Sequence, residues 1–134
     1  IDIEISKLLS KGVIVETAHC SGEFLSNIFC SAKKDGSHRL ILNLKKLNEN
    51  IAYYHFKIET LQNVLQLVKP NSWLAVIDLR DAYYSVPISP KDRKYVRFQH
   101  DGKLYEFVCL PNGLSSAPRI FTKLFKPIFS KLNS

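Results

Sequence analysis

Two aspartates, Asp78 and Asp81, stand at the end of a nearly continuous apolar run that covers residues 73–79. A run of this kind is expected of a buried strand, which delivers charged side chains at one of its ends. Carboxylate oxygens are the hard ligands that Mg²⁺ prefers in proteins, and a rigid strand end suits such a ligand. Asp78 is therefore the first candidate for metal-dependent chemistry, against the simpler interpretation of a surface or capping aspartate that follows a core strand.

Basic residues supply a second candidate site, because Lys33 and Lys34 open a polar stretch, residues 33–38, between two β-prone segments. The chain carries 19 Lys+Arg against 12 Asp+Glu, and the formal net charge of +7 favours a polyanionic partner such as nucleic acid. A lysine pair at a hairpin tip is by itself usually a solvated turn. The charge pattern thus indicates a class of partner and no particular ligand.

Two hairpins are predicted to position these residues, because two pairs of β-prone segments each flank an Asp-Gly turn. The first hairpin joins residues 24–32 to residues 40–44 and carries the basic stretch at its tip. The second joins residues 94–99 to residues 103–109 and has aromatic residues on both arms.

Amphipathic helices are predicted where apolar residues recur three and four positions apart. They cover residues 1–9, closed by Gly12, residues 61–68, ended by Pro70, and residues 120–132, where Pro127 is expected to produce a kink. Helices and antiparallel hairpins alternate without the regular rhythm of a parallel sheet, so the predicted class is α+β.

Composition limits the other possibilities. With 134 residues and 46% hydrophobic content, the chain can bury one core and needs no second domain. Its 3 cysteines lack C-x-x-C spacing, which indicates neither a disulfide framework nor a thiolate metal site and favours an intracellular location, cytoplasm or nucleus. The apolar runs are short and interrupted by charge, so no membrane partner is expected.

The run VIDLRDAYYSVP at residues 76–87 closely resembles the first catalytic motif of reverse transcriptases. Three other regions agree in the family's order: residues 33–48 resemble its basic fingers hairpin, residues 110–118 its nucleotide-pocket loop, and residues 89–98 match as well. The resemblance spans nearly the whole chain. Residues 112–123 look most like retrotransposons of the tyrosine-recombinase (DIRS-like) type or related LTR retrotransposons.

The resemblance implies roles for the first motif. Asp78 would be the catalytic residue and a metal ligand. Asp81 and Ala82 would contact the incoming triphosphate largely through the backbone, although the Asp81 carboxylate could instead cap the next helix. Tyr83 falls where the family places an aromatic steric gate against a ribose 2′-hydroxyl. The alternatives are a core tyrosine at this position and a gate at Tyr84.

It also implies a nucleotide pocket between the first hairpin and the loop. Lys33 and Arg39 would grip the triphosphate, with Lys34 as a third member, because a guanidinium can hold phosphate oxygens bidentately. Gly113 would let the backbone approach the nucleotide closely. Many family members have glutamine or phenylalanine where this chain has Asn112, which leaves open whether the side chain touches the nucleotide or tunes fidelity.

Several basic residues near the motif would contact template or primer phosphates, or would form a solvated polar face. They are Arg80, Lys91, Arg93, Lys94 and Arg97.

The implied fold is a right-hand polymerase, with one incomplete domain over residues 1–134. Fingers are expected at about residues 1–70 and 85–110, and part of the palm at about 71–84 and 111–134. The implied activity is template-directed DNA synthesis from dNTPs on a primed RNA or DNA template, with two Mg²⁺ ions as cofactors.

No aspartate-pair motif follows within residues 124–134, so this segment alone is expected to be catalytically incompetent. The rest of the palm, the thumb and an RNase H region of the same polyprotein would be its partners. Two alternatives stay open: a non-catalytic, nucleic-acid-binding remnant of a retroelement, and a metal-dependent nuclease using Asp78 and Asp81. The nuclease accounts for the carboxylates but not for Tyr83 or the basic hairpin.

Overall fold

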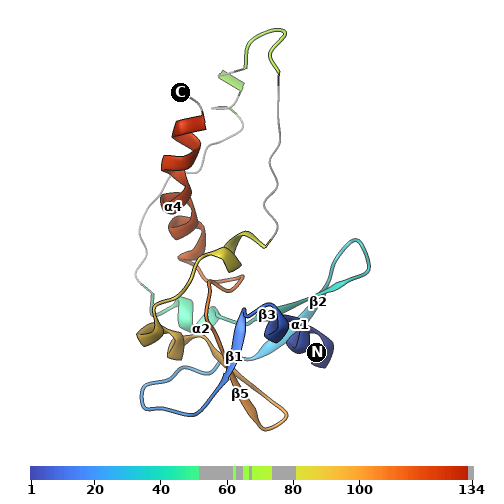
Figure 1. The fold of residues 1–134 in the computed structure, drawn as a ribbon, viewed down its shortest axis with the longest axis vertical. Coiled ribbons are helices and arrows are strands. Elements are labelled where there is room, and N and C mark those ends of the chain that lie inside the picture. Colours follow the sequence, from blue (N-terminus) through green and yellow to red (C-terminus); the bar gives the residue numbers. More distant parts are fainter. Residues whose placement is uncertain (52–61, 63–64, 67, 74–80, 133–134) are drawn as a thin grey trace.

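The computed structural model describes residues 1–51, 62, 65–66, 68–73 and 81–132, and it has the α+β character that the sequence predicts (Figure 1). The predicted helix at residues 61–68 lies largely outside the described residues, and so does the predicted strand at residues 73–79. Asp78 and Arg80 belong to that undescribed part.

Helix α1 (Asp2–Ser10) forms as its apolar spacing predicts, and it buries Ile5 and Leu8 against the strands. Acidic side chains in its first turn suit the positive end of the helix dipole. The helix ends where Gly12 adopts a left-handed φ of 71°, and the Gly12 amide donates to the carbonyl of Leu9 at 3.1 Å. Glycine is the residue that takes this conformation without strain.

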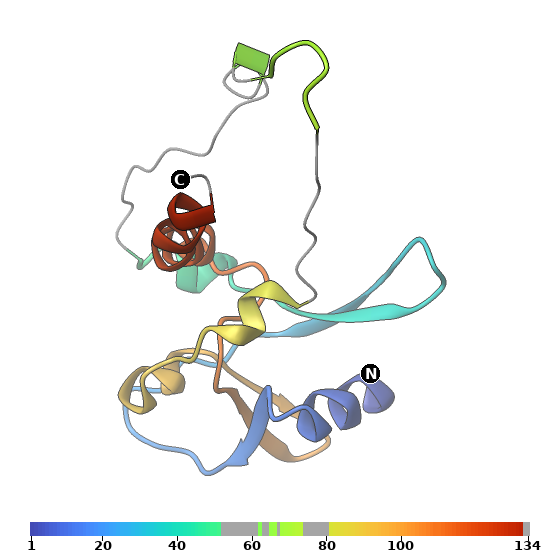
Figure 2. The same cartoon turned by 45° about the horizontal axis from the view of Figure 1, so that its top comes forward.

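The first hairpin pairs β2 (Ile28–Ala32) with β3 (His38–Leu42) in antiparallel register. Leu40 and Leu42 point into the core, which places the alternate residues of β3 on the outer face. The strand begins later than predicted, because the amides of Phe24 and Ser26 donate instead to the carbonyls of Lys94 and Arg97, at 2.8 Å and 2.9 Å. Figures 1 and 2 show this hairpin projecting away from the rest of the chain.

The second hairpin joins β4 (Arg97–His100) to β5 (Lys103–Phe107), and β5 also pairs with β1 (Ile14–Thr17), so the sheet order is β1-β5-β4. Both turn residues adopt positive φ, 48° at Asp101 and 74° at Gly102, as a two-residue type I′ turn requires. The predicted hairpin is confirmed.

Short helical segments connect the strands: α2 (Lys45–Asn48), η1 (Ala82–Ser85) and η2 (Pro90–Tyr95). The last helix, α4 (Ala117–Leu132), forms as predicted, with Pro127 inside it. Figure 1 shows α4 extending away from the sheets.

Two groups of buried side chains hold these elements together. The main core joins α1, both hairpins and α2, and it is centred on Phe98 and Phe107, which are 0% and 1% exposed. The second core joins η1 to the start of α4 through Val86, Leu110 and Ala117. No described helix is long and apolar enough to cross a membrane.

Candidate nucleotide-binding site

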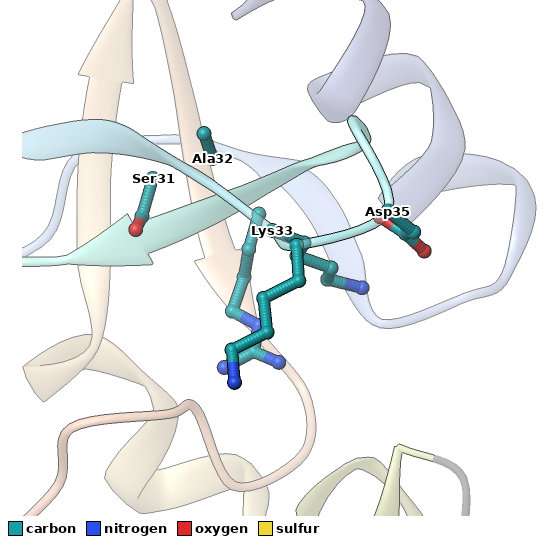
Figure 3. A pocket seen from close by; sticks show the side chains of 6 residues that line it. Ser31, Ala32, Lys33 and Asp35 are labelled. Carbon is teal, nitrogen blue, oxygen red and sulfur yellow. The ribbon is translucent and has the colours of Figure 1, made fainter.

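A basic pocket lies at the tip of the first hairpin. It has a volume of about 470 Å³ and is lined by Ser31, Ala32, Lys33, Lys34, Asp35 and Arg39. Figure 3 shows the Lys33 side chain extending away from Asp35, which stays at the turn. Asp35 accepts hydrogen bonds from the amide and hydroxyl of Ser37, at 3.0 Å and 2.6 Å, and these bonds lower its pKa. The acidic side chain of the pocket, Asp35, is thus hydrogen-bonded to Ser37 within the turn.

Strand alternation places Arg39 on the outer face of β3. Its neighbour Leu40 is buried, whereas Arg39 itself is exposed and stands opposite Ser31 in the register. The tip residues Lys33 and Lys34 are exposed as well. The structure therefore brings together the three cations that the resemblance assigns to the triphosphate.

Asp81 occupies the N-cap position of η1 but makes no side-chain capping hydrogen bond. Its backbone is left-handed, with φ 49°, and its carboxylate accepts from the Lys11 ammonium group at 3.4 Å. The interpretation that this carboxylate caps the following helix is therefore wrong. The sequence did not predict the contact between Lys11 and Asp81, because the two residues lie 70 positions apart.

The two tyrosines of η1 occupy different environments, and Ala82 before them is half-buried. The Tyr83 ring contacts Phe121 of α4 edge-on, with ring centroids 5.7 Å apart, and so belongs to the second core. Tyr84 packs against the main core. The steric gate that the resemblance assigns to Tyr83 stays a prediction.

The Tyr84 hydroxyl lies among residues assigned to the nucleotide site. The Asn112 amide donates to it at 3.4 Å. Burial raises the pKa of Tyr84, and the negative charge of Asp81 adds to that increase, while the positive charge of Arg39 opposes it. The direct contact of this hydroxyl is thus the Asn112 side chain, which lies 28 residues further along the chain.

The loop that carries Asn112 and Gly113 has a constrained backbone. Gly113 has φ 96°, and a Cβ atom there would lie 3.6 Å from the carbonyl oxygen of Leu42 at the end of β3. The Asn48 side chain binds the same loop, donating to the Gly113 carbonyl at 3.0 Å and accepting from the Ser115 amide at 2.9 Å. Sequence reasoning did not identify Asn48, although it lies in the matched stretch after the first hairpin.

The residues predicted to contact phosphates separate into two groups. Lys91 is exposed, Lys94 lies 5.3 Å from the Tyr95 ring centroid, and the Arg93 guanidinium donates to the Ile88 carbonyl at 3.0 Å. Arg97 is 6% exposed, and its guanidinium binds Glu23 at 2.8 Å and Glu106 at 2.9 Å. The prediction for Arg97 is wrong, because a buried guanidinium paired with two carboxylates cannot reach nucleic acid.

The described residues do not test the predicted Mg²⁺ ligand. Asp78 lies outside them, and Asp81 is bound to Lys11. Within the described ranges, the acidic and histidine side chains close enough to share an ion are Asp2, His100 and Asp101, at the start of α1 and the second hairpin turn. Both aspartates there are exposed, and none of the three belongs to the predicted site.

A family model described as "Reverse transcriptase (RNA-dependent DNA polymerase)" matches residues 31–134. The chain is 30% identical over 131 residues to the Pol polyprotein of equine infectious anemia virus (strain Wyoming), an alignment that covers 92% of this chain and 11% of the relative. It is 25% identical over 122 residues to the Pro-Pol polyprotein of simian foamy virus type 1, covering 91% of this chain and 10% of the relative. The chain thus spans about a tenth of the length of these relatives.

Solved structures agree in fold. The native prototype foamy virus protease-reverse transcriptase superposes with a TM-score of 0.75 at 24% identity, covering 94% of this chain and 17% of that one. The foamy viral protease-reverse transcriptase in complex with dsDNA superposes with a TM-score of 0.73 at 22% identity, covering 91% and 25%. The resemblance to tyrosine-recombinase retrotransposons stays a prediction. On the family match and these relatives, the chain belongs to the reverse transcriptase (RNA-dependent DNA polymerase) family.

Proposed function

We propose that this chain forms the fingers and part of the palm of a template-directed DNA polymerase, and that the first hairpin and the loop at residues 112–115 bind the incoming dNTP. One observation carries the proposal: Lys33, Lys34 and Arg39, the three cations assigned to the triphosphate, line one pocket at the tip of the first hairpin. The bond from the Asn112 amide to the Tyr84 hydroxyl, at 3.4 Å, also joins the loop to η1, the segment that follows Asp81.

The proposed division has fingers at about residues 1–70 and 85–110 and partial palm at about 71–84 and 111–134. The main core takes its side chains from α1, both hairpins and α2, which belong to the proposed fingers. The second core connects the two parts, because it joins Val86 and Leu110 of the proposed fingers to Ala117, Tyr83 and Phe121 of the proposed palm segments.

Charge and geometry suit the pocket to a triphosphate. Lys33, Lys34 and Arg39 would neutralise the triphosphate oxygens, and the Arg39 guanidinium can hold two of them at once. The backbone of Asp81, Ala82 and Gly113 would approach the nucleotide from the other side, since glycine leaves room for close contact. Tyr83 would exclude a ribose 2′-hydroxyl.

Two Mg²⁺ ions and a primed RNA or DNA template complete the proposal, with Asp78 as the metal ligand and catalytic residue that this chain contributes. Bound Mg²⁺ would supply Lewis-acid stabilisation of the phosphate oxygens. Template and primer phosphates would meet Arg80, Lys91, Arg93 and Lys94; binding of dsDNA by the foamy viral relative supports this assignment. The rest of the palm, the thumb and an RNase H region would come from the same polyprotein.

The test is Asp78→Asn in the complete polymerase that carries this chain. Asparagine keeps the shape but removes the charge that holds a divalent ion, so single-nucleotide primer extension should fall by roughly a thousandfold. Primer-template binding should change little. Asp101→Asn, which removes the same charge from the turn of the second hairpin, is the matched control and should extend normally. Near-normal extension by Asp78→Asn would refute the assignment, and a wild-type protein that binds nucleic acid without extending primers would be the non-catalytic remnant.

A further inference from the structure

The loop of residues 112–115 belongs to the proposed nucleotide site, and contacts from other segments hold its backbone. Gly113 adopts φ 96°, and the loop passes beside the end of β3. Such loops sample several conformations unless other groups fix them. Asn112 is attached on one side, where its amide donates to the Tyr84 hydroxyl at 3.4 Å.

Asn48 fixes the other side of the loop with both ends of one carboxamide. Its Nδ2 donates to the Gly113 carbonyl at 3.0 Å, and its Oδ1 accepts from the Ser115 amide at 2.9 Å. These two bonds set the orientation of the peptide groups on either side of Leu114, so the direction of the Gly113 carbonyl is determined by Asn48 and not by the solvent.

Asn48 is itself held by the main core. It is the last residue of α2, and its amide donates to the Leu44 carbonyl at 2.7 Å. Leu44 and Leu47 are 2% and 7% exposed, which anchors this short helix beneath the loop. The position of Asn48 is therefore set by the packing of α2 on the core, and the loop binds to its carboxamide.

We infer that Asn48 is a positioning residue for the dNTP, holding the backbone of Gly113 and the side chain of Asn112 in the conformation that receives the nucleotide, a role that rests on the proposed function. Asn48 contacts the loop through hydrogen bonds and need not touch the nucleotide. Preorganised contacts of this kind lower the cost of binding a ligand in its reactive geometry.

The chemistry of the carboxamide makes the inference specific. Asn48→Asp keeps the acceptor for the Ser115 amide but cannot donate to the Gly113 carbonyl when it is ionised. Asn48→Ala removes both bonds. Asn50 provides a matched control, because this asparagine lies two residues further on, after the end of α2, and its side-chain amide donates to the Lys46 carbonyl of α2 at 3.0 Å.

The kinetic experiment uses the complete polymerase that carries this chain. Asn48→Ala should raise the KM for dNTP about threefold to tenfold, with a smaller change in kcat, because the loop must be ordered each time a nucleotide binds. Asn48→Asp should fall between Asn48→Ala and wild type. Asn50→Ala should behave as wild type, and all variants should bind primer-template with unchanged affinity. A KM shift that is equal in Asn50→Ala, or a parallel loss of primer-template affinity, would show that Asn48 acts only on general stability and would overturn the inference.

A second measurement needs no activity. In the complete polymerase that carries this chain, amide hydrogen exchange followed by mass spectrometry should show the Ser115 amide exchanging at least about tenfold faster in Asn48→Ala and near the wild-type rate in Asn48→Asp. Unchanged Ser115 exchange in Asn48→Ala would refute the attachment of the loop even if Asp78→Asn behaves as proposed. A wild-type polymerase without activity would refute the proposed function, and the nucleotide part of this inference with it.

Discussion

Tyr83 and Tyr84 are neighbours in η1, yet their rings enter different cores. Tyr83 contacts Phe121 on α4, and Tyr84 joins the main core while its hydroxyl accepts from Asn112. In a short 3₁₀ segment, consecutive side chains point in directions about 120° apart, which makes this division natural. Substitutions at the two positions should therefore have separable effects.

In the complete polymerase, Tyr83→Ala should admit ribonucleotides, raising their incorporation relative to deoxynucleotides by about tenfold or more, because it removes a wall beside the sugar. Tyr83→Phe keeps the ring and should keep the discrimination. Tyr84→Phe removes only the hydroxyl that Asn112 binds, so sugar discrimination should persist while the KM for dNTP rises by less than about threefold. The measurement is single-nucleotide extension with each substrate type. Loss of discrimination in a Tyr84 variant, with Tyr83→Ala unchanged, would place the gate at Tyr84.

Individual site residues differ in how far the sequence could predict them. Lys33, Lys34 and Arg39 could be placed together because they flank one turn, and local spacing determines where hairpin residues lie. The bonds from Lys11 to Asp81 and from Asn48 to the loop could not, since each joins residues more than sixty positions apart and leaves no periodic signal. Positive charge alone was also an insufficient basis for predicting phosphate contacts, because Arg97 is buried.

At the scale of elements, Arg97 joins the second hairpin to the segment before the first one. Its guanidinium binds Glu106 on β5 and Glu23, and it donates to the Ala18 carbonyl at 3.0 Å. The backbone continues the connection, because the Ser26 amide donates to the Arg97 carbonyl at 2.9 Å. The cost of desolvating the positive charge of Arg97 is thus compensated by its bonds to two carboxylates and a carbonyl.

Replacing Arg97 should cost stability and leave nucleic-acid contacts unaffected. Arg97→Ala leaves Glu23 and Glu106 without their shared partner, and the free energy of unfolding should fall by about 3 kcal/mol in denaturant titrations. Arg97→Lys should recover only part of the loss, because an ammonium group cannot reproduce the forked contacts. The exposed Lys91→Ala is the control, expected within about 0.5 kcal/mol of wild type. An Arg97→Ala protein of normal stability that binds primer-template weakly would restore the phosphate-contact assignment.

Elements with strong local signals could be predicted closely, and those that depend on distant contacts could not. The Asp101-Gly102 turn fixes the second hairpin, because only certain residues adopt two successive positive φ angles. The predicted first strand of that hairpin began at Lys94, whereas residues 90–95 form η2. Pro90 at its first turn and the bond from Arg93 to the Ile88 carbonyl favour the 3₁₀ conformation over an extended one.

At the scale of the whole molecule, the second core is much smaller than the main core. Its buried members are Val86, Leu110 and Ala117, and α4 continues well beyond them. Leu124 on that helix is 53% exposed. An exposed apolar side chain on an amphipathic helix promotes association.

The 134-residue chain should therefore self-associate. By itself it should also show no primer extension, because it contains no aspartate-pair motif after α4 begins. Leu124→Gln should reduce association at micromolar concentration, measured by sedimentation velocity, with little change in the melting transition, because the side chain is already exposed. Lys126→Gln, an exposed polar position on the same helix, is the control and should leave association unchanged. A monodisperse wild-type monomer, or template-dependent incorporation by the chain alone, would contradict these expectations.

The pairing of β1 with β5 also determines the order in which the chain can fold while it is being translated. Ile14 pairs with Phe107, so β1 leaves the ribosome about 90 residues before its partner strand exists. At roughly 5 to 20 residues per second, that delay lasts for several seconds. The β2–β3 hairpin, whose strands are adjacent in sequence, can close long before then. Nascent chains of this family member should thus carry a finished basic hairpin beside an unpaired β1, and a chaperone that shields apolar strands would act during that interval.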